Sequence, residues 1–202
     1  MHALFTEIVD GDIEAVRERL EATPEAVALV ASGSPKRFAG RSPLMVALIS
    51  GEFDIAHLLL DHGADVDFFD SSRSDFHRPV LHDAVTAAVL RSRPTPAALR
   101  EGVDRATPAF SVLERMLRAG ADADAEDDRG GRVMERAASD AFQMLPRDAA
   151  EDVEPTFAAN LTRIFALLRE HGQSADRVDP QLGKSSAEYY ATTTTGRFLA
   201  PA

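Results

Sequence analysis

The sequence predicts an all-α protein built from stacked helix–turn–helix units, and three observations carry this expectation. A turn-like phrase occurs twice, as DHGADVDFFD at residues 61–70 and as RAGADADAED at residues 118–127. The segments before both phrases carry apolar residues at helical spacing. A pair of such short helices is too small to bury a core alone, so the units are expected to stack on one another in a solenoid.

The clearest unit covers residues 40–70. Ser42 is a suitable N-cap for a first helix, and the following proline suits its first turn. Gly51 separates this helix from a second one, which Gly63 is expected to end as a left-handed cap. The apolar stripe of the second helix consists of Ile55, Leu58 and Leu59.

This unit resembles an ankyrin repeat, whose pattern is roughly G-x-T-P-L-H-x-A-A-x-x-G, then an outer helix with two leucines, then G-A-D-V-N. The resemblance implies an ankyrin-repeat solenoid of about four to five repeats that binds another protein and has neither catalytic activity nor a cofactor. The matching residues are Gly40, Ser42, Pro43, Leu44, Ala47, Gly51, Leu58, Leu59, Gly63, Ala64, Asp65, Val66 and Asp67.

The other units are degenerate copies, and we expect all of them to form one domain at residues 1–191. The N-terminal unit contains Gly11 where a helix break is expected, and Ile13, Val16 and Leu20 on its outer helix. The expected divisions are an N-terminal cap at 1–38, repeats at 39–70, 71–127 and 128–178, a C-terminal cap at 179–191 and a tail at 192–202.

Two insertions enlarge the central repeats. The capping glycines Gly63, Gly120 and Gly172 lie more than about 50 residues apart, against roughly 33 in the family, so each later repeat gains about 20 residues. The first insertion, at 88–108, is expected to contain a short helix that opens at Thr95 and Pro96. The second, at 141–155, is expected to be a solvated loop. Both are expected on one edge of the solenoid, where they either bind a partner or only lengthen the core.

The composition and charge of the chain limit the kinds of partner that it can bind. The chain has 202 residues with 22 basic and 33 acidic side chains and a formal charge of −11. Such a surface repels nucleic acid and anionic lipid, and it favours a basic protein partner unless the charge only maintains solubility. There is no cysteine, no segment with the features of a secretory signal, and no apolar run long enough to span a membrane. We therefore expect a cytoplasmic protein, acting as a monomer.

Large apolar residues in the hairpin fingers are the strongest interface candidates, because finger positions need not serve the core. The alternative is that the finger after Gly63 folds back and buries its phenylalanines. The candidates in that finger are Phe68, Phe69, Phe76, His77 and Arg78. The preceding finger contributes Phe38 and Arg41, next to Lys36 and Arg37, and the following acidic finger contributes Glu126, Asp128 and Arg129.

No residue set matches a known catalytic or metal-binding spacing. His62 and His171 precede capping glycines, and His82 stands at the position of the family's structural histidine. His2 and His57 are isolated in the sequence, no zinc-type histidine spacing occurs, and neither a phosphate-binding loop nor a calcium loop is complete. A cleft lined by His77, His82 and Asp83 is the one enzymatic alternative. The expected function is an inhibitor or immunity-type protein for a basic effector, or a scaffold for a larger assembly.

Overall fold

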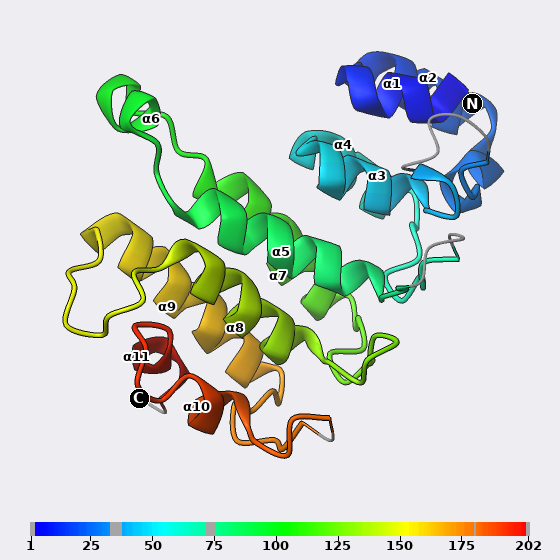
Figure 1. Cartoon of the computed structure of the whole chain (residues 1–202). Helices are drawn as coiled ribbons and strands as arrows, with labels where there is room; N and C mark the ends of the chain where they lie inside the picture. Colours follow the sequence, from blue (N-terminus) through cyan, green and yellow to red (C-terminus); the bar gives the residue numbers. More distant parts are fainter. Residues whose placement is uncertain (1–2, 33–37, 72–75, 180, 201–202) are drawn as a thin grey trace.

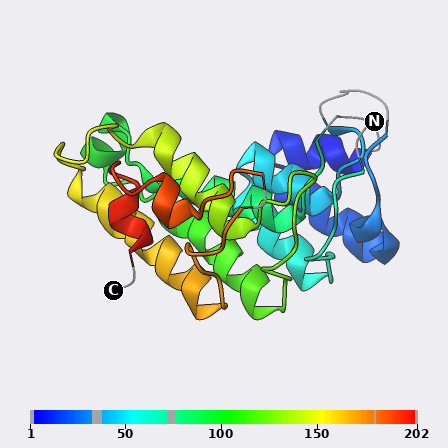
Figure 2. The ribbon, with the colours of Figure 1, turned by 60° about the horizontal axis from the view of Figure 1, so that its bottom comes forward.

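The computed structural model describes residues 3–32, 38–71, 76–179 and 181–200, and its regular structure consists of helices with two isolated β-bridges. Successive helices pair and stack in a row from the N-terminus to the C-terminus, which confirms the predicted all-α solenoid (Figures 1 and 2). The inner helices are α1 (Ala3–Asp10), α3 (Pro43–Ser50), α5 (Val80–Ser92), α8 (Val133–Met144) and α10 (Ser186–Tyr189). The outer helices are α2 (Ile13–Ala22), α4 (Phe53–Asp61), α7 (Ala106–Arg118), α9 (Pro155–Glu170) and α11 (Gly196–Leu199).

Two further helical segments lie outside this alternation. A 3₁₀ helix, η1 (Pro24–Ala28), follows α2, and α6 (Pro96–Glu101) lies between α5 and α7. Helix α5 is central, because it packs against α3, α7, α8 and α9. The buried apolar side chains form one continuous cluster that extends from Leu4 to Leu199. Each unit therefore completes the core of its neighbours, as the shortness of the helices requires.

The helix ends use the capping residues that the sequence indicates. The Ser42 hydroxyl oxygen accepts a hydrogen bond from the Met45 amide at 3.2 Å at the start of α3. Outer helices α4, α7 and α9 each end just before a glycine in the left-handed region, with φ of 79° at Gly63, 93° at Gly120 and 83° at Gly172. The repeated turn of the sequence is therefore a repeated helix cap.

Replacing Gly63 with valine is expected to lower the free energy of unfolding by about 1–3 kcal/mol, because a β-branched residue is strained at positive φ. A Cβ atom at this position would meet no other atom within 4 Å, so the cost is backbone strain and not a clash. Urea denaturation measures the loss, and Gly63→Asn, which tolerates this conformation better, is the matched control. A valine variant as stable as the wild type would contradict the placement of the cap.

The first insertion contains the short helix that the sequence predicts, because the Thr95 hydroxyl oxygen accepts from the Ala98 amide at 3.1 Å at the start of α6. In the second insertion, predicted as a loop at 141–155, residues 141–144 belong to α8 and Pro155 begins α9, and only residues 145–154 between them lack a helix. The bases of the two insertions meet where Arg93 Nη1 donates to the Met144 carbonyl at 3.4 Å. Both insertions lie at the same edge of the solenoid (left in Figure 1).

The segment after α10 packs against the domain. Thr194 and Thr195 are fully buried, and Leu199 in α11 is 2% exposed. The Arg169 guanidinium donates to the carbonyl oxygens of Phe198 at 2.6 Å and Ala200 at 3.1 Å. Residues 192–200, which the sequence assigned to a tail, therefore cover the outer helix α9 at the C-terminal end of the stack.

Candidate functional site

Hairpin fingers connect the outer helices to the next inner helices, and the three fingers that follow α4, α7 and α9 are hydrogen-bonded to their neighbours. We call residues 63–79 the first finger, 119–132 the second and 172–185 the third. The Asp122 amide donates to Asp67 Oδ1 at 2.7 Å, which joins the first two fingers. The Gln181 side-chain amide donates to the Arg129 carbonyl at 2.8 Å, which joins the second and third. The fingers therefore form one linked edge of the molecule.

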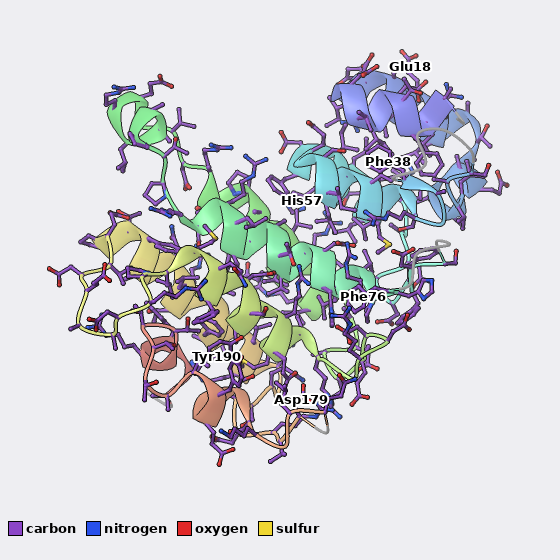
Figure 3. The ribbon with its side chains drawn as sticks, in the orientation of Figure 1. Glu18, Phe38, His57, Phe76, Asp179 and Tyr190 are labelled. Atoms are coloured by element: carbon purple, nitrogen blue, oxygen red, sulfur yellow. The ribbon has the colours of Figure 1, made fainter. Side chains whose placement is uncertain are left out.

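Four of the predicted interface residues meet where the first and second fingers touch. His77 Nδ1 lies 2.6 Å from Asp128 Oδ2, and the His77 amide donates to the same oxygen at 2.8 Å. The Arg129 guanidinium lies over the ring of Phe76, 5.0 Å from its centroid (Phe76 is labelled in Figure 3). The aromatic finger and the acidic finger thus bind each other, and together they form one surface where the sequence suggested two adjacent patches.

Two predicted arginines point inward at the base of the first finger. Arg78 binds Asp83 with Nη2 at 2.5 Å and Nε at 3.0 Å from Oδ1, and Arg41 Nε lies 3.7 Å from Asp70 Oδ2. Their side chains are only 17% and 19% exposed. Paired charges that are this well buried hold the finger in place, so Arg41 and Arg78 have structural positions.

The aromatic candidates divide into buried and exposed side chains. The prediction that Phe38 is an exposed anchor is wrong, because it is 3% exposed and belongs to the core. Phe68 is half-buried and packs against the same core, whereas its neighbour Phe69 is 42% exposed. Successive side chains of this extended segment point in opposite directions, so only one of the pair faces the core. Lys36 and Arg37 lie outside the described residues.

Glu126 belongs to an ion-pair cluster between the second and third fingers. Its carboxylate pairs with the Arg177 guanidinium and also accepts from Arg132 Nε at 3.3 Å. Arg177 extends the cluster to Glu135 of α8, with Nη1 at 3.6 Å from Oε1. Such a network fixes the relative position of two fingers more than it presents free charge.

An open pocket of about 280 Å³ lies between the second finger, the third finger, α8 and α10. Charged groups at its wall include Arg129, Asp127 and Lys184. Two large apolar side chains stand beside them, with Leu182 58% exposed and Tyr189 51% exposed. Exposed apolar side chains next to charges in a hollow are typical of protein interfaces. Neither residue stands out in the sequence, because this region resembles only a terminal cap.

Comparison with known sequences identifies one repeat of the chain. The family model described as ankyrin repeat matches residues 39–71, which contain α3, α4 and the start of the first finger. Residues 39–71 therefore form an ankyrin repeat. No curated protein sequence gives a significant match to the chain. Ankyrin repeats are in general protein–protein interaction modules.

The proposed enzymatic cleft is absent from the described part of this ankyrin repeat protein. His82 and Asp83 are only 1% and 5% exposed, so neither lines an open cleft with His77. Burial lowers the pKa of His82 to about 4, and the negative charge of Asp127 only partly opposes this effect. His82 Nδ1 lies 3.9 Å from Asp127 Oδ2, so the histidine faces the next finger, which fits a structural position.

His57 is not isolated, as the sequence suggested, but contacts Ser111 and Arg115 between outer helices α4 and α7 (His57 is labelled in Figure 3). His57 Nε2 lies 2.9 Å from Ser111 Oγ. The Ser111 hydroxyl donates its own proton to the Pro108 carbonyl at 2.8 Å, so His57 donates to the serine and does not activate it. Burial and the Arg115 charge lower the pKa of His57.

The described residues contain neither a metal-binding cluster nor a helix suited to cross a membrane. Among them, no group of three or more histidine, aspartate or glutamate side chains is arranged to hold a metal ion. No helix within the same part of the chain has the length and apolarity that crossing a membrane demands. His2 lies outside the described residues.

Proposed function

We propose that this ankyrin repeat protein binds a partner protein through the concave face that its inner helices and fingers form, and that it has no catalytic activity of its own. The observation that carries the proposal is the 280 Å³ pocket beside the second and third fingers, with Leu182 and Tyr189 half exposed at its wall. Exposed Phe69 and the Phe76–Arg129 pair extend this surface along the finger edge. Aromatic and arginine side chains are the residue types enriched in interface centres.

The expected partner is a basic protein, and the formal charge of −11 supports this expectation. Electrostatic steering by such a charge speeds encounter with a basic surface and weakens as salt concentration rises. An acidic module acting as a cytoplasmic monomer suits an inhibitor or immunity-type protein that blocks a basic effector. In this mode the acidic side chains of the fingers, among them Asp128, help to orient the basic partner on the finger face.

A scaffold that organises a larger assembly is the second candidate. The apolar exposure of Phe69, Leu182 and Tyr189 favours it, because apolar contacts do not depend on the net charge of the partner. The affinity of binding through these side chains alone is expected to change little as the salt concentration rises.

Affinity capture with immobilised wild-type protein tests the proposal. We expect wild type to retain a partner. The double variant Leu182→Ser, Tyr189→Ser is expected to bind this partner with an affinity at least about tenfold lower, which corresponds to about 1.4 kcal/mol of binding free energy. Val30→Ser, at a side chain that is 44% exposed and distant in sequence from the residues that line the pocket, is the matched control. Release by salt supports the inhibitor, and retention in salt supports the scaffold. Equal capture by wild type and the double variant would contradict the proposed face.

A further inference from the structure

The first insertion forms a projecting hairpin whose surface is unusually apolar. We call residues 90–105 the α6 hairpin, and Figure 1 shows α6 standing away from the stacked helices. Leu90, Leu99 and Val103 are 53%, 56% and 52% exposed, whereas Ala98 of the same hairpin is buried. An insertion that only lengthened the core would bury its large apolar side chains, so the exposed set indicates contact with another molecule.

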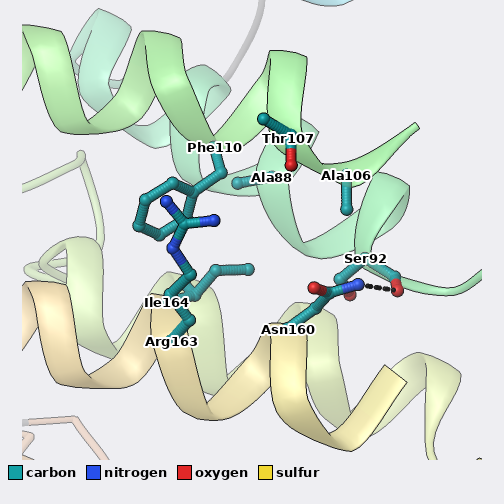
Figure 4. A pocket seen from close by; sticks show the side chains of 8 residues that line it. All are labelled: Ala88, Ser92, Ala106, Thr107, Phe110, Asn160, Arg163 and Ile164. Atoms are coloured by element: carbon teal, nitrogen blue, oxygen red, sulfur yellow. Dashed lines mark hydrogen bonds between the residues drawn. The ribbon is translucent and has the colours of Figure 1, made fainter. Parts of the chain in front are cut away.

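A groove runs beneath the hairpin. It has a volume of about 290 Å³, and its lining includes Arg91, Pro94, Leu99, Val103, Arg105 and Asn160. Its floor is ordered by contacts from α9, which Figure 4 shows for a small adjoining pocket that shares Ser92, Ala106 and Asn160. There Asn160 binds the Ser92 carbonyl at 2.9 Å, and the Arg163 guanidinium lies 3.7 Å from the Phe110 ring centroid. The groove is therefore built between a projecting arm and a fixed floor.

The arginines of the α6 hairpin are the second distinguishing feature. Arg115, Arg132 and Arg177 elsewhere in the protein each pair with a carboxylate. Within the described residues, no carboxylate lies within ion-pair distance of Arg91, Arg93, Arg100 or Arg105. The Asp104 carboxylate is instead occupied by the amides of Ala106 and Thr107, at 2.9 and 3.0 Å, at the start of α7.

The hairpin is thus a basic site on an acidic protein. It carries four arginines against Glu101 and Asp104, while the whole chain has a charge of −11. Burial lowers the pKa of Arg91 and the nearby positive charge of Arg105 lowers it further, while the negative charge of Glu52 partly opposes both effects. The Arg91 guanidinium also lies over the Phe53 ring, 5.8 Å from its centroid. A carboxylate placed between these two guanidinium groups would relieve their repulsion and gain charge-assisted hydrogen bonds.

We propose that the α6 hairpin and its groove form a second docking surface, which receives a segment of a partner protein that combines large apolar side chains with carboxylates. The apolar side chains pack on Leu99 and Val103, and the carboxylates bind Arg91 and Arg105. This chemistry is opposite in charge to that expected for the partner at the finger face. The two proposed surfaces are therefore independent. An experiment that contradicts one of them does not contradict the other.

Selection from a displayed random-peptide library tests this surface with a defined probe. On immobilised wild-type protein we expect enriched peptides that are rich in aspartate or glutamate and in leucine or phenylalanine. Leu99→Ser and Arg105→Glu are each expected to weaken these peptides by at least about tenfold. Both altered side chains are exposed, so thermal melting is expected to stay unchanged and to verify folding. Val30→Ser and the finger-face variant Tyr189→Ser serve as controls that retain binding.

Two kinds of result would overturn the proposal. Enriched peptides that are basic, or that bind wild type, Leu99→Ser and Arg105→Glu equally, would show that the hairpin does not select this chemistry. Self-association of the wild-type chain that Leu99→Ser abolishes, measured by analytical ultracentrifugation, would assign the groove to a second copy and would also overturn it. Loss of the acidic apolar peptides in both hairpin variants, with retention in both controls, supports it.

Discussion

Leu59→Ala is expected to lower the free energy of unfolding by about 2–5 kcal/mol, because it removes a fully buried side chain from the core and leaves a cavity. Leu59 lies in α4, which packs against α3 on one side and α7 on the other. In a solenoid each repeat is stabilised mainly by its neighbours, so a cavity here weakens two interfaces at once. Denaturation in urea, followed by circular dichroism, measures the loss.

The matched control for this substitution is Leu90→Ala, since Leu90 is 53% exposed at the end of α5. It removes the same atoms from an inner helix but leaves no cavity, so we expect a change within about 0.5 kcal/mol. Equal effects of the two substitutions would contradict the stacking of α4 between its neighbours.

Acidification is expected to destabilise the protein through His82. The pKa of this histidine is about 4 in the folded protein, lowered mainly by burial, against about 6.5 in an unfolded chain. Above pH 6.5 the ring is neutral in both states, so its contribution to stability is complete. As the pH falls toward 4, the unfolded chain binds a proton that the folded protein excludes, and each pH unit costs about 1.4 kcal/mol. The total loss is about 3 kcal/mol.

Stability curves of wild type and His82→Gln between pH 7 and 4 isolate this effect. Other groups, including buried Asp83 and His57, titrate in both proteins and cancel in the comparison. We expect the two curves to converge as the pH falls, because only the wild type loses the contribution of His82. Parallel curves would show that the His82 ring is accessible to protons in the folded state.

The sequence predicts the architecture well because its signals are local. Glycine caps, the Ser42 cap and the short helix that opens at Pro96 each depend on a few neighbouring residues, and all are present. A structural position for His82 was also expected from the resemblance, and the side chain is 1% exposed. Local patterns of this kind determine helix type and helix ends without knowledge of the tertiary structure.

The finger surface was less predictable, because it depends on contacts between distant segments. His77 and Asp128 are 51 residues apart, and the length of the intervening insertion hides their register. The apolar character of Phe38 fits an interface as well as a core, and only packing shows that it is buried. The threonine-rich segment before α11 has the composition of a tail, yet its residues Thr194 and Thr195 are fully buried.

The most direct test of the central claim is hydrogen–deuterium exchange of the protein alone and in complex with the partner that affinity capture yields. Partner binding at the finger face is expected to slow amide exchange in residues 127–131 and 181–186, which contribute to the lining of the pocket with Leu182 and Tyr189. Helices α2 and α4 on the outer side are expected to exchange as in the free protein. Slowed exchange confined to the outer helices, with the fingers unchanged, would contradict the proposed binding face.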